Sequence, residues 1–163
     1  MSLKINYSNK TLSKNSSNIV LFTNDDFKIN RLKNFLLDSE FSYIDELLKN
    51  SDSKKNLLLF EVNSKKKIVL ISIKKNLKSS DIENLGAEFY KKINFGKNSD
   101  YFVISDSLES KYKNFLGYFL HGCKLKSYEF KKYKSKKNSR NIEIYISGNK
   151  NKPSSREQLK FKA

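Results

Sequence analysis

The sequence has few of the residues on which disulfide scaffolds, membrane spans and many active sites depend. Its 163 residues include one cysteine, one proline, one histidine, five glycines and no tryptophan. A single cysteine, Cys123, cannot form an intrachain disulfide, which excludes a disulfide scaffold and suggests a reducing compartment. No apolar run approaches the ~18 residues that a membrane span needs, and the N-terminus lacks a secretory signal core of about 7–15 apolar residues. We therefore expect a soluble, cytoplasmic protein with no membrane partner.

The scarcity of histidine, cysteine and glycine also limits the chemistry that the chain can perform. A catalytic metal site needs about three convergent protein ligands. His121 and Cys123 are two residues apart and would point to different sides of a helix. We interpret His121 as a residue of the helix face and Cys123 as a small buried hydrophobe. The carboxylate pairs Asp25-Asp26 and Asp45-Glu46 are most simply solvated. No glycine spacing matches a phosphate-binding loop, and no nucleophile elbow is present. We identify no catalytic and no metal-binding residue and expect the chain to be inactive alone.

Lysine and aromatic residues, in contrast, are abundant. The chain has 33 Lys and Arg against 17 Asp and Glu, a net charge of +16, and its 12 Phe and 9 Tyr are too many for a disordered polyelectrolyte. Only Arg31, Arg140 and Arg156 are arginines, which leaves 30 lysines. Lysine is a hydrated point charge without the planar fork that arginine presents to phosphates and bases. Two explanations stay open: the composition of an AT-rich coding sequence, or a role in binding polyanions.

The lysines are densest between residues 111 and 137, where nine of them stand against one acid, Glu129. Apolar residues from Tyr112 to Cys123 recur at helical spacing, which predicts a helix with one apolar and one positive side. A solvated outer face is the simpler interpretation, and contact with a polyanion or a membrane surface is the alternative. The candidate polyanion contacts are Lys111, Lys113, Lys124, Lys126, Lys131, Lys132, Lys134, Lys136 and Lys137.

Hydrophobic periodicity predicts a mixed α/β domain. Strands are expected where residues alternate, around Leu3–Tyr7 and Ile142–Ile146, and where short apolar runs occur, at Ile19–Phe22, Leu57–Val62, Ile68–Ile73 and Tyr101–Ile104. The five residues between Val62 and Ile68 are too few for a crossover helix, so these two strands should form an antiparallel hairpin. Helices are expected over Phe41–Leu48, capped by Ser39 or Ser42, and over Ile82–Ile93, capped by Ser79 or Ser80.

The end of the chain differs from the rest. We interpret residues 1–150 as one domain and residues 151–163 as a linker and the start of another helix. Ser154 and Glu157 have the spacing of a capping box, and the helix that they begin reaches Ala163 without a stop signal. Isolated helices shorter than ~12–15 residues are marginal in water. We therefore expect the sequence to be cut from a larger protein.

One motif and several segments resemble a known family. Gly122, Leu125, Tyr128, Phe130 and Tyr133 follow the pattern Gly-x-x-Leu-x-x-Tyr-x-Phe-x-x-Tyr, which resembles a helix in the N-terminal domain of the leucyl (cytosol) aminopeptidase family. Other segments are similar in the same order along the chain: Ser42–Leu48, the hairpin of Leu57–Val62 and Lys67–Ile73, Leu85–Glu88, and the chain from Ser155 onward. The segment Ile71–Lys74 departs from the glycine-containing end that the family usually has at its second hairpin strand.

The resemblance implies a macro-domain-like fold, with a mostly parallel sheet of about six strands between helices. It also implies a two-domain parent enzyme that removes N-terminal residues from peptides with two divalent metal ions, zinc or manganese. The ligands of those ions and the catalytic residues belong to the family's C-terminal domain and have no matching positions here. The family forms hexamers in which N-terminal domains help to join trimers, and some bacterial members bind DNA. True macro domains have glycine-rich ligand loops that this chain lacks.

Two hypotheses follow. The chain is the non-catalytic N-terminal domain of a leucyl aminopeptidase, whose partners are its own catalytic domain and further copies of itself. Alternatively, it is a free-standing lysine-rich module that binds nucleic acid or another polyanion. Aromatic residues of the motif could stack on bases in the second case, although packing in a core or an interface explains them more simply.

Overall fold

The computed structural model shows six strands and three α-helices over the part of the chain that it describes. The helices and strands are β1 (Ser2–Asn6), β2 (Asn18–Asn24), the 3₁₀-helix η1 (Asn30–Phe35), α1 (Asp38–Lys49), β3 (Leu57–Asn63), β4 (Lys66–Ile73), α2 (Ser79–Ile93), β5 (Ser99–Ile104), the 3₁₀-helix η2 (Ser105–Ser107), α3 (Phe115–Tyr133) and β6 (Asn141–Ser147). The described residues are 2–7, 18–24, 27, 29–50, 55–94, 99–109, 114–133, 141–148, 153 and 156, with only the backbone of residues 2 and 130–133.

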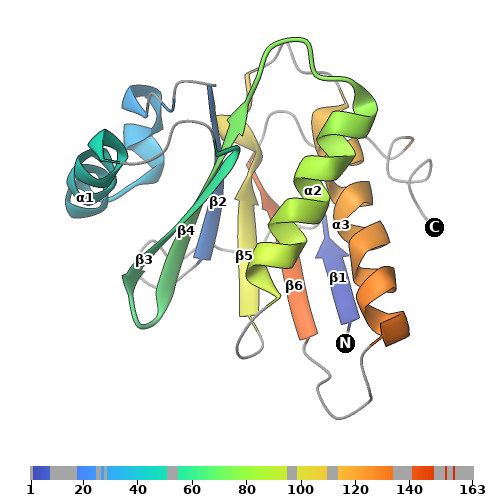
Figure 1. Ribbon diagram of the computed structural model, residues 1–163. Helices are drawn as coiled ribbons and strands as arrows, with labels where there is room; N and C mark the ends of the chain where they lie inside the picture. The colour runs from blue at the N-terminus through green and yellow to red at the C-terminus, as the bar shows by residue number, and fades with distance from the viewer. Residues whose placement is uncertain are drawn as a thin grey trace.

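The strands form one mixed sheet in the order β1-β6-β5-β2-β4-β3 (Figure 1). All neighbouring pairs are parallel except β3 and β4, which form the predicted antiparallel hairpin. In the hairpin turn, the Asn63 side chain accepts a hydrogen bond from the backbone N–H of Lys65 at 2.7 Å. The predicted fold class, a mostly parallel sheet of about six strands flanked by helices, is confirmed.

Strand β2 lies inside the sheet and is buried on both faces. It pairs with β4 on one side and with β5 on the other. Side chains alternate along a strand, so Val20 and Phe22 enter the core beneath α2 and α3, whereas Ile19 and Leu21 enter the core on the side of α1 and η1. The continuous apolar run in the sequence therefore reflects two hydrophobic cores, one on each face of the sheet.

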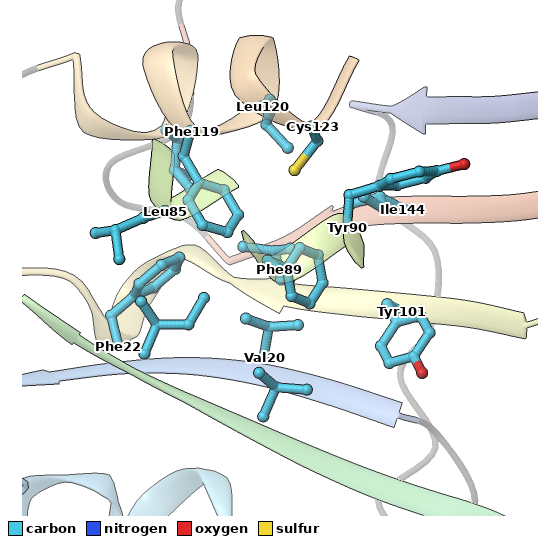
Figure 2. Close-up of a cluster of buried hydrophobic side chains, with 14 of the residues drawn as sticks. Val20, Phe22, Leu85, Phe89, Tyr90, Tyr101, Phe119, Leu120, Cys123 and Ile144 are labelled. Carbon is cyan, nitrogen blue, oxygen red and sulfur yellow. The ribbon is translucent and has the colours of Figure 1, made fainter. Parts of the chain in front are cut away.

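Aromatic rings fill the core between the sheet and the helices α2 and α3 (Figure 2). The ring of Phe22 meets Phe115 and Phe119 edge-on, with centroids 5.4 and 5.5 Å apart. Phe89 on α2 meets Tyr101 on β5 in the same way at 5.9 Å. Burial raises the pKa of Tyr101 to about 12, because the charged phenolate would lose its hydration in this core. The high aromatic content of the chain thus serves, in part, to build this core.

The helices α1 and η1 cover the other face of the sheet over β2 and its neighbours. Leu32 of η1 and Ile44 of α1 are fully buried there. The sequence between Asn24 and Asn34 gives no clear pattern, because its buried residues Phe27, Ile29 and Leu32 are spaced two and three apart, which fits neither a strand nor an α-helix throughout.

The predicted N-terminal caps of α1 and α2 are wrong. Helix α1 begins at Asp38 and follows Leu37, so Ser39 and Ser42 lie inside it. The carboxylate of Glu40 accepts a hydrogen bond from the backbone N–H of Leu37 at 3.0 Å. In α2, Ser79 and Ser80 likewise lie inside the helix, and Asp81 accepts from the N–H of Lys78 at 2.9 Å. At both helices an acidic residue in the first turn, rather than a serine before it, satisfies the terminal N–H.

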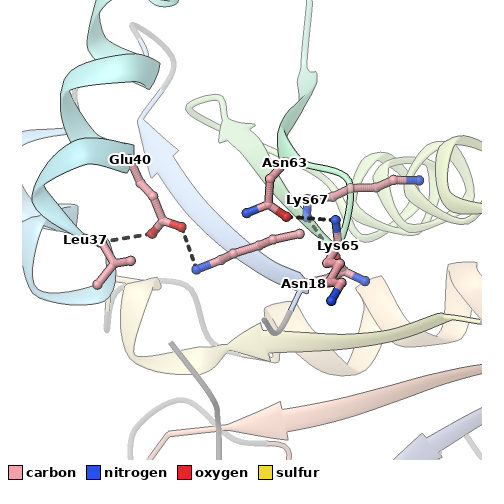
Figure 3. Close-up of polar contacts among 7 residues, drawn as sticks. Asn18, Leu37, Glu40, Asn63, Lys65 and Lys67 are labelled. Carbon is pink, nitrogen blue, oxygen red and sulfur yellow. Dashed lines mark hydrogen bonds and ion pairs between the residues drawn. The ribbon is translucent and has the colours of Figure 1, made fainter. Parts of the chain in front are cut away.

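A buried ion pair joins α1 to the β3–β4 hairpin. The ammonium nitrogen of Lys66 lies 2.7 Å from Oε2 of Glu40, and their side chains are only 2% and 3% exposed. Figure 3 shows the two contacts of Glu40, one to this ammonium group and one to the N–H of Leu37. Charges that have lost their water are stable only when they are paired and hydrogen-bonded. The pair therefore makes the position of α1 depend on the hairpin.

At the end of the chain, Arg156 is helical and exposed, whereas the predicted cap Ser154 and the other residues of that helix lie outside the described residues. Within the described part of the chain, no helix is both long enough and apolar enough to cross a membrane.

We predict that Lys66→Met destabilises the protein by about 3–5 kcal/mol, because the Glu40 carboxylate is then buried without its counter-charge. The measurement is urea unfolding followed by circular dichroism. The double variant Lys66→Met/Glu40→Gln should recover at least half of that loss, since a neutral amide can still accept from Leu37. A single variant as stable as the wild type would contradict the importance of the pair.

Candidate functional site

The helices α2 and α3 cross at two glycines, one of which belongs to the sequence motif. A Cβ atom on Gly122 of α3 would collide with the carbonyl oxygen of Glu83 on α2. A Cβ atom on Gly86 of α2 would collide in the same way with the carbonyl oxygen of Phe119 on α3. Only glycine therefore allows the two backbones to approach this closely. The motif residue Gly122 has a structural reason to be glycine at this crossing.

Cys123 and His121 lie next to the same crossing and contact different groups. Cys123 is fully buried, and its thiol donates a hydrogen bond to the carbonyl oxygen of Gly86 with an Sγ–O distance of 3.2 Å. Burial raises the pKa of this thiol, which therefore stays protonated and is a poor nucleophile. His121 is half-buried, and its Nδ1 lies 3.5 Å from Oε1 of Glu83. The two residues are thus held by separate contacts with α2.

Further along α3, two apolar residues of the motif lie on the surface. Leu125 is 45% exposed and Tyr128 is 44% exposed. Residues three apart are neighbours on a helix, so these two side chains form one exposed pair. The side chains of Phe130 and Tyr133 are outside the described residues. The structure therefore places Leu125 and Tyr128 outside the core, which leaves an interface as the packing explanation for them.

The described part of α3 contains two of the candidate polyanion contacts. Lys124 and Lys126 are both half-buried, and the Lys126 ammonium lies 3.2 Å from the Glu129 carboxylate. The other candidates have no described side chain: Lys111, Lys113, Lys131, Lys132, Lys134, Lys136 and Lys137. Of the two lysine side chains that the structure describes here, one is thus paired with an acid.

In open α/β folds, ligands usually bind at the carboxyl ends of the strands. The usual place is where the connections from two neighbouring strands run to opposite sides of the sheet. In this sheet that point lies at the carboxyl ends of β2 and β5, because the chain continues from β2 to β3 on one side and from β5 to β6 on the other. The hydroxyl of Ser107 in η2 accepts a hydrogen bond from the N–H of Phe22 at 3.0 Å and donates one to the carbonyl of Ile104 at 2.6 Å. The guanidinium of Arg31 donates to the carbonyl oxygens of Phe22 and Ser107. Protein groups therefore already satisfy these backbone atoms.

The described residues do not fit the two-metal centre that the family resemblance implies for the parent enzyme. Among them, no three His, Cys, Asp or Glu side chains are grouped so that they could hold a metal ion. Of the two carboxylate pairs in the sequence, Asp25-Asp26 lies outside the described residues. Asp45 forms an exposed ion pair with Lys49 at 3.8 Å, and Glu46 is exposed.

Sequence reasoning missed the polar groups that connect distant segments. Arg31 joins η1 to β2 and η2, because one amino group of its guanidinium donates to the carbonyl oxygens of Phe22 and Ser107. Its rarity in a lysine-rich chain is a signal that could have identified it. The pair of Glu40 and Lys66 left no such signal, since its members are 26 residues apart and resemble the many other charged residues of the chain.

Comparisons with known proteins support the fold but no family membership. No family model and no curated protein sequence matches this chain. Among solved structures, a lysine-to-glutamate variant of tomato leucine aminopeptidase is similar, with a TM-score of 0.64 and 15% sequence identity. The similarity covers 98% of this chain and 35% of the tomato chain. At this identity the likeness shows a shared α/β fold, and this chain spans about a third of that enzyme's length.

We predict that Gly122→Ala destabilises the protein by about 2–4 kcal/mol, because the added methyl group would force α2 and α3 apart and loosen the core beneath them. Lys124→Ala, two residues away on the same helix, is the matched control and should change stability by less than about 0.5 kcal/mol. Thermal and urea unfolding measure both variants. Equal stability of the two variants would contradict the close crossing.

Proposed function

We propose that this chain is a non-catalytic N-terminal domain of a leucyl-aminopeptidase-like enzyme and that it serves in oligomer assembly. The observation that carries the proposal is the fold likeness, which covers 98% of this chain but 35% of tomato leucine aminopeptidase. The order of the motif segments along the sequence agrees with this likeness. In this proposal, the full-length protein removes N-terminal residues from peptides with two divalent metal ions that its catalytic domain holds.

The surface of α3 supports the assembly role. Leu125 and Tyr128 expose large apolar side chains next to each other, and burial of such a pair against another subunit would remove apolar area from water. The glycine crossing anchors α3 rigidly three residues before Leu125. A fixed backbone lowers the conformational entropy that association costs. The pair is therefore a preorganised contact surface.

A second candidate function is polyanion binding, which the net charge of +16 favours. Non-specific attraction to nucleic acid follows from the release of counterions, and it needs cations but no particular fold. Lys124 is half-buried and directly precedes Leu125 of the apolar pair on α3. Tyr128, at 44% exposure, could stack on an unpaired base.

For the assembly role, we expect the purified chain to self-associate in a concentration-dependent way in sedimentation equilibrium. Leu125→Ser/Tyr128→Ser should weaken association about ten-fold or more, because it removes the exposed apolar pair. Lys124→Ser is the matched control and should associate as the wild type does. A chain that stays monomeric at all concentrations, or a double variant that associates normally, would argue against this surface.

The same preparation tests the non-catalytic part of the proposal. With leucyl-p-nitroanilide and manganese or zinc, the isolated chain should release no nitroaniline above the rate of buffer with metal. Metal-dependent turnover that follows the protein through purification would refute the non-catalytic assignment.

For the alternative, we expect any binding to fluorescent single-stranded or duplex DNA to fall steeply as salt rises from about 50 to 200 mM. Fluorescence anisotropy measures it. Lys124→Gln/Lys126→Gln should weaken the binding, whereas Lys49→Gln on α1 should not. Absence of binding at about 50 mM salt would eliminate this function.

A further inference from the structure

Two strands lie at the edges of the sheet, β1 on one side and β3 on the other (Figure 1). In the described part of the chain, each has a neighbouring strand on one side only. Proteins commonly protect such edges with charges, proline or short strands, because the outer backbone groups can pair with a further strand. Strand β1 has five residues with the exposed Lys4 at its centre. Strand β3 has seven residues, five of them apolar, and is therefore the less protected edge.

The hydrogen bonds to β4 decide which residues of β3 direct their backbone groups outward. The carbonyl oxygen of Asn56 accepts from the N–H of Ser72 at 2.8 Å, so these two residues form a hydrogen-bonded pair of the hairpin. In antiparallel strands, such pairs alternate with residues whose N–H and C=O groups point away from the neighbouring strand. Leu57, Leu59 and Glu61 therefore direct these groups to the open edge.

The side chains along this edge are apolar in the middle and charged at the ends. Leu58, Leu59 and Val62 are half-buried, and each packs against one of the two cores. Lys55 and Glu61 are both exposed. Because side chains alternate along a strand, these two charges lie on the same face of the sheet as Leu59. A strand that covered the edge would bury more apolar area and would meet one charge at each end.

A second copy of the chain supplies a strand whose charges match. If a two-fold axis passes through Leu58 and the two β3 strands run antiparallel, Lys55 of each copy faces Glu61 of the other. Within its own copy, Glu61 already faces Lys67 on β4, so the acid would lie between lysines of two neighbouring strands. Opposite charges that face each other across strands are stabilising. Moving the axis by one residue in either direction removes both ion pairs, so the charges select one register.

We propose that two copies of this chain associate edge to edge through β3, so that one sheet continues through both. Leu57, Leu59 and Glu61 exchange backbone hydrogen bonds with Leu59, Leu57 and Lys55 of the other copy, and Leu58 lies beside its own counterpart on the axis. The contact uses the same surface on both copies and therefore closes at a dimer. This edge is separate from the exposed pair on α3, and the inference does not rest on the proposed function.

Disulfide cross-linking of Leu58→Cys in a glutathione buffer tests the position of the axis. The two Cα atoms should be about 4.5–5.5 Å apart there, within the range of natural disulfides. Val62→Cys, on the same strand and face, is the matched control, because its two copies would be about 27 Å apart along the strands. The native Cys123 is fully buried and should not interfere. We expect linked dimer to form at least about ten times faster with Leu58→Cys. Equal rates would overturn the proposal.

A second cross-link does not depend on changing a half-buried residue. Lys55→Cys/Glu61→Cys replaces two exposed residues, which the fold should tolerate. Each new thiol faces the other position in the second copy, so this variant should also form linked dimers. Lys55→Cys alone should not, because its two copies would be about 20 Å apart. If both the single and the double variant stay unlinked, or link equally fast, the register is wrong.

Charge variants in the Leu58→Cys background test the two ion pairs. Glu61→Lys should slow cross-linking about ten-fold, because it places lysine opposite Lys55 at both ends. Lys55→Glu/Glu61→Lys restores opposite charges and should cross-link at least about three times faster than Glu61→Lys alone. Asp100→Lys, an exposed change on β5 with the same effect on net charge, is the control and should leave the rate unchanged. A double variant no faster than the single one would refute the pairing of Lys55 with Glu61.

One further variant separates this contact from the assembly surface on α3. Leu125→Ser/Tyr128→Ser in the Leu58→Cys background should cross-link at an unchanged rate, because α3 lies over the opposite part of the sheet, near β1 (Figure 1). Failure of the α3 surface would therefore leave this cross-link intact. Loss of the cross-link in that variant would overturn association through the β3 edge.

Discussion

The close crossing of α2 and α3 is the constraint on which most of this structure depends. Gly86 and Gly122 let the two backbones touch, so the two helices can cover the sheet together as one layer. The aromatic rings of Phe89 and Phe119 meet beneath this crossing, with centroids 5.5 Å apart. The thiol of Cys123 on α3 donates a hydrogen bond to the carbonyl oxygen of Gly86 on α2. Because the crossing fixes the rotation of α3, it also decides which residues of that helix face outward.

The opposite face of the sheet is held by different chemistry. There α1 depends on the buried ion pair between Glu40 and Lys66, and on an apolar core that includes Ile44 and Phe60. Apolar residues alone would satisfy this core in many arrangements, whereas a buried charge has one acceptable partner. We interpret the pair as the device that selects the position of α1 against the hairpin. One face of the sheet is thus specified by shape and the other by charge.

The sequence was sufficient to predict the strands, the hairpin and the two covered faces, because alternation and apolar runs report burial directly. Ile19–Phe22 and Ile142–Ile146 illustrate both patterns. The prediction of the caps was wrong because Glu40 and Asp81, rather than serines, accept hydrogen bonds from the N–H groups at the helix starts. Serine is also frequent in this chain, so its position indicates little. The Glu40–Lys66 pair could not be predicted, because its residues come from separate elements and become neighbours only after folding. For the motif, spacing indicated a helix but not that Gly122 would be buried while Leu125 and Tyr128 are exposed.

A shared fold does not determine function, since one α/β scaffold supports many unrelated sites. The distinction between assembly and polyanion binding therefore depends on the outward side of α3. Over residues 115–129 this helix carries Lys124 and Lys126 against Glu129, and Lys126 is already paired with that acid. Lys131 and Lys132 follow in the same helix, but their side chains lie outside the described residues. An ion pair beside two exposed apolar side chains resembles the polar rim and apolar centre of a protein interface more than the basic track that a phosphate backbone requires. Over residues 115–129, the surface of α3 therefore supports the proposal of assembly, because its two exposed apolar side chains would gain from contact with protein.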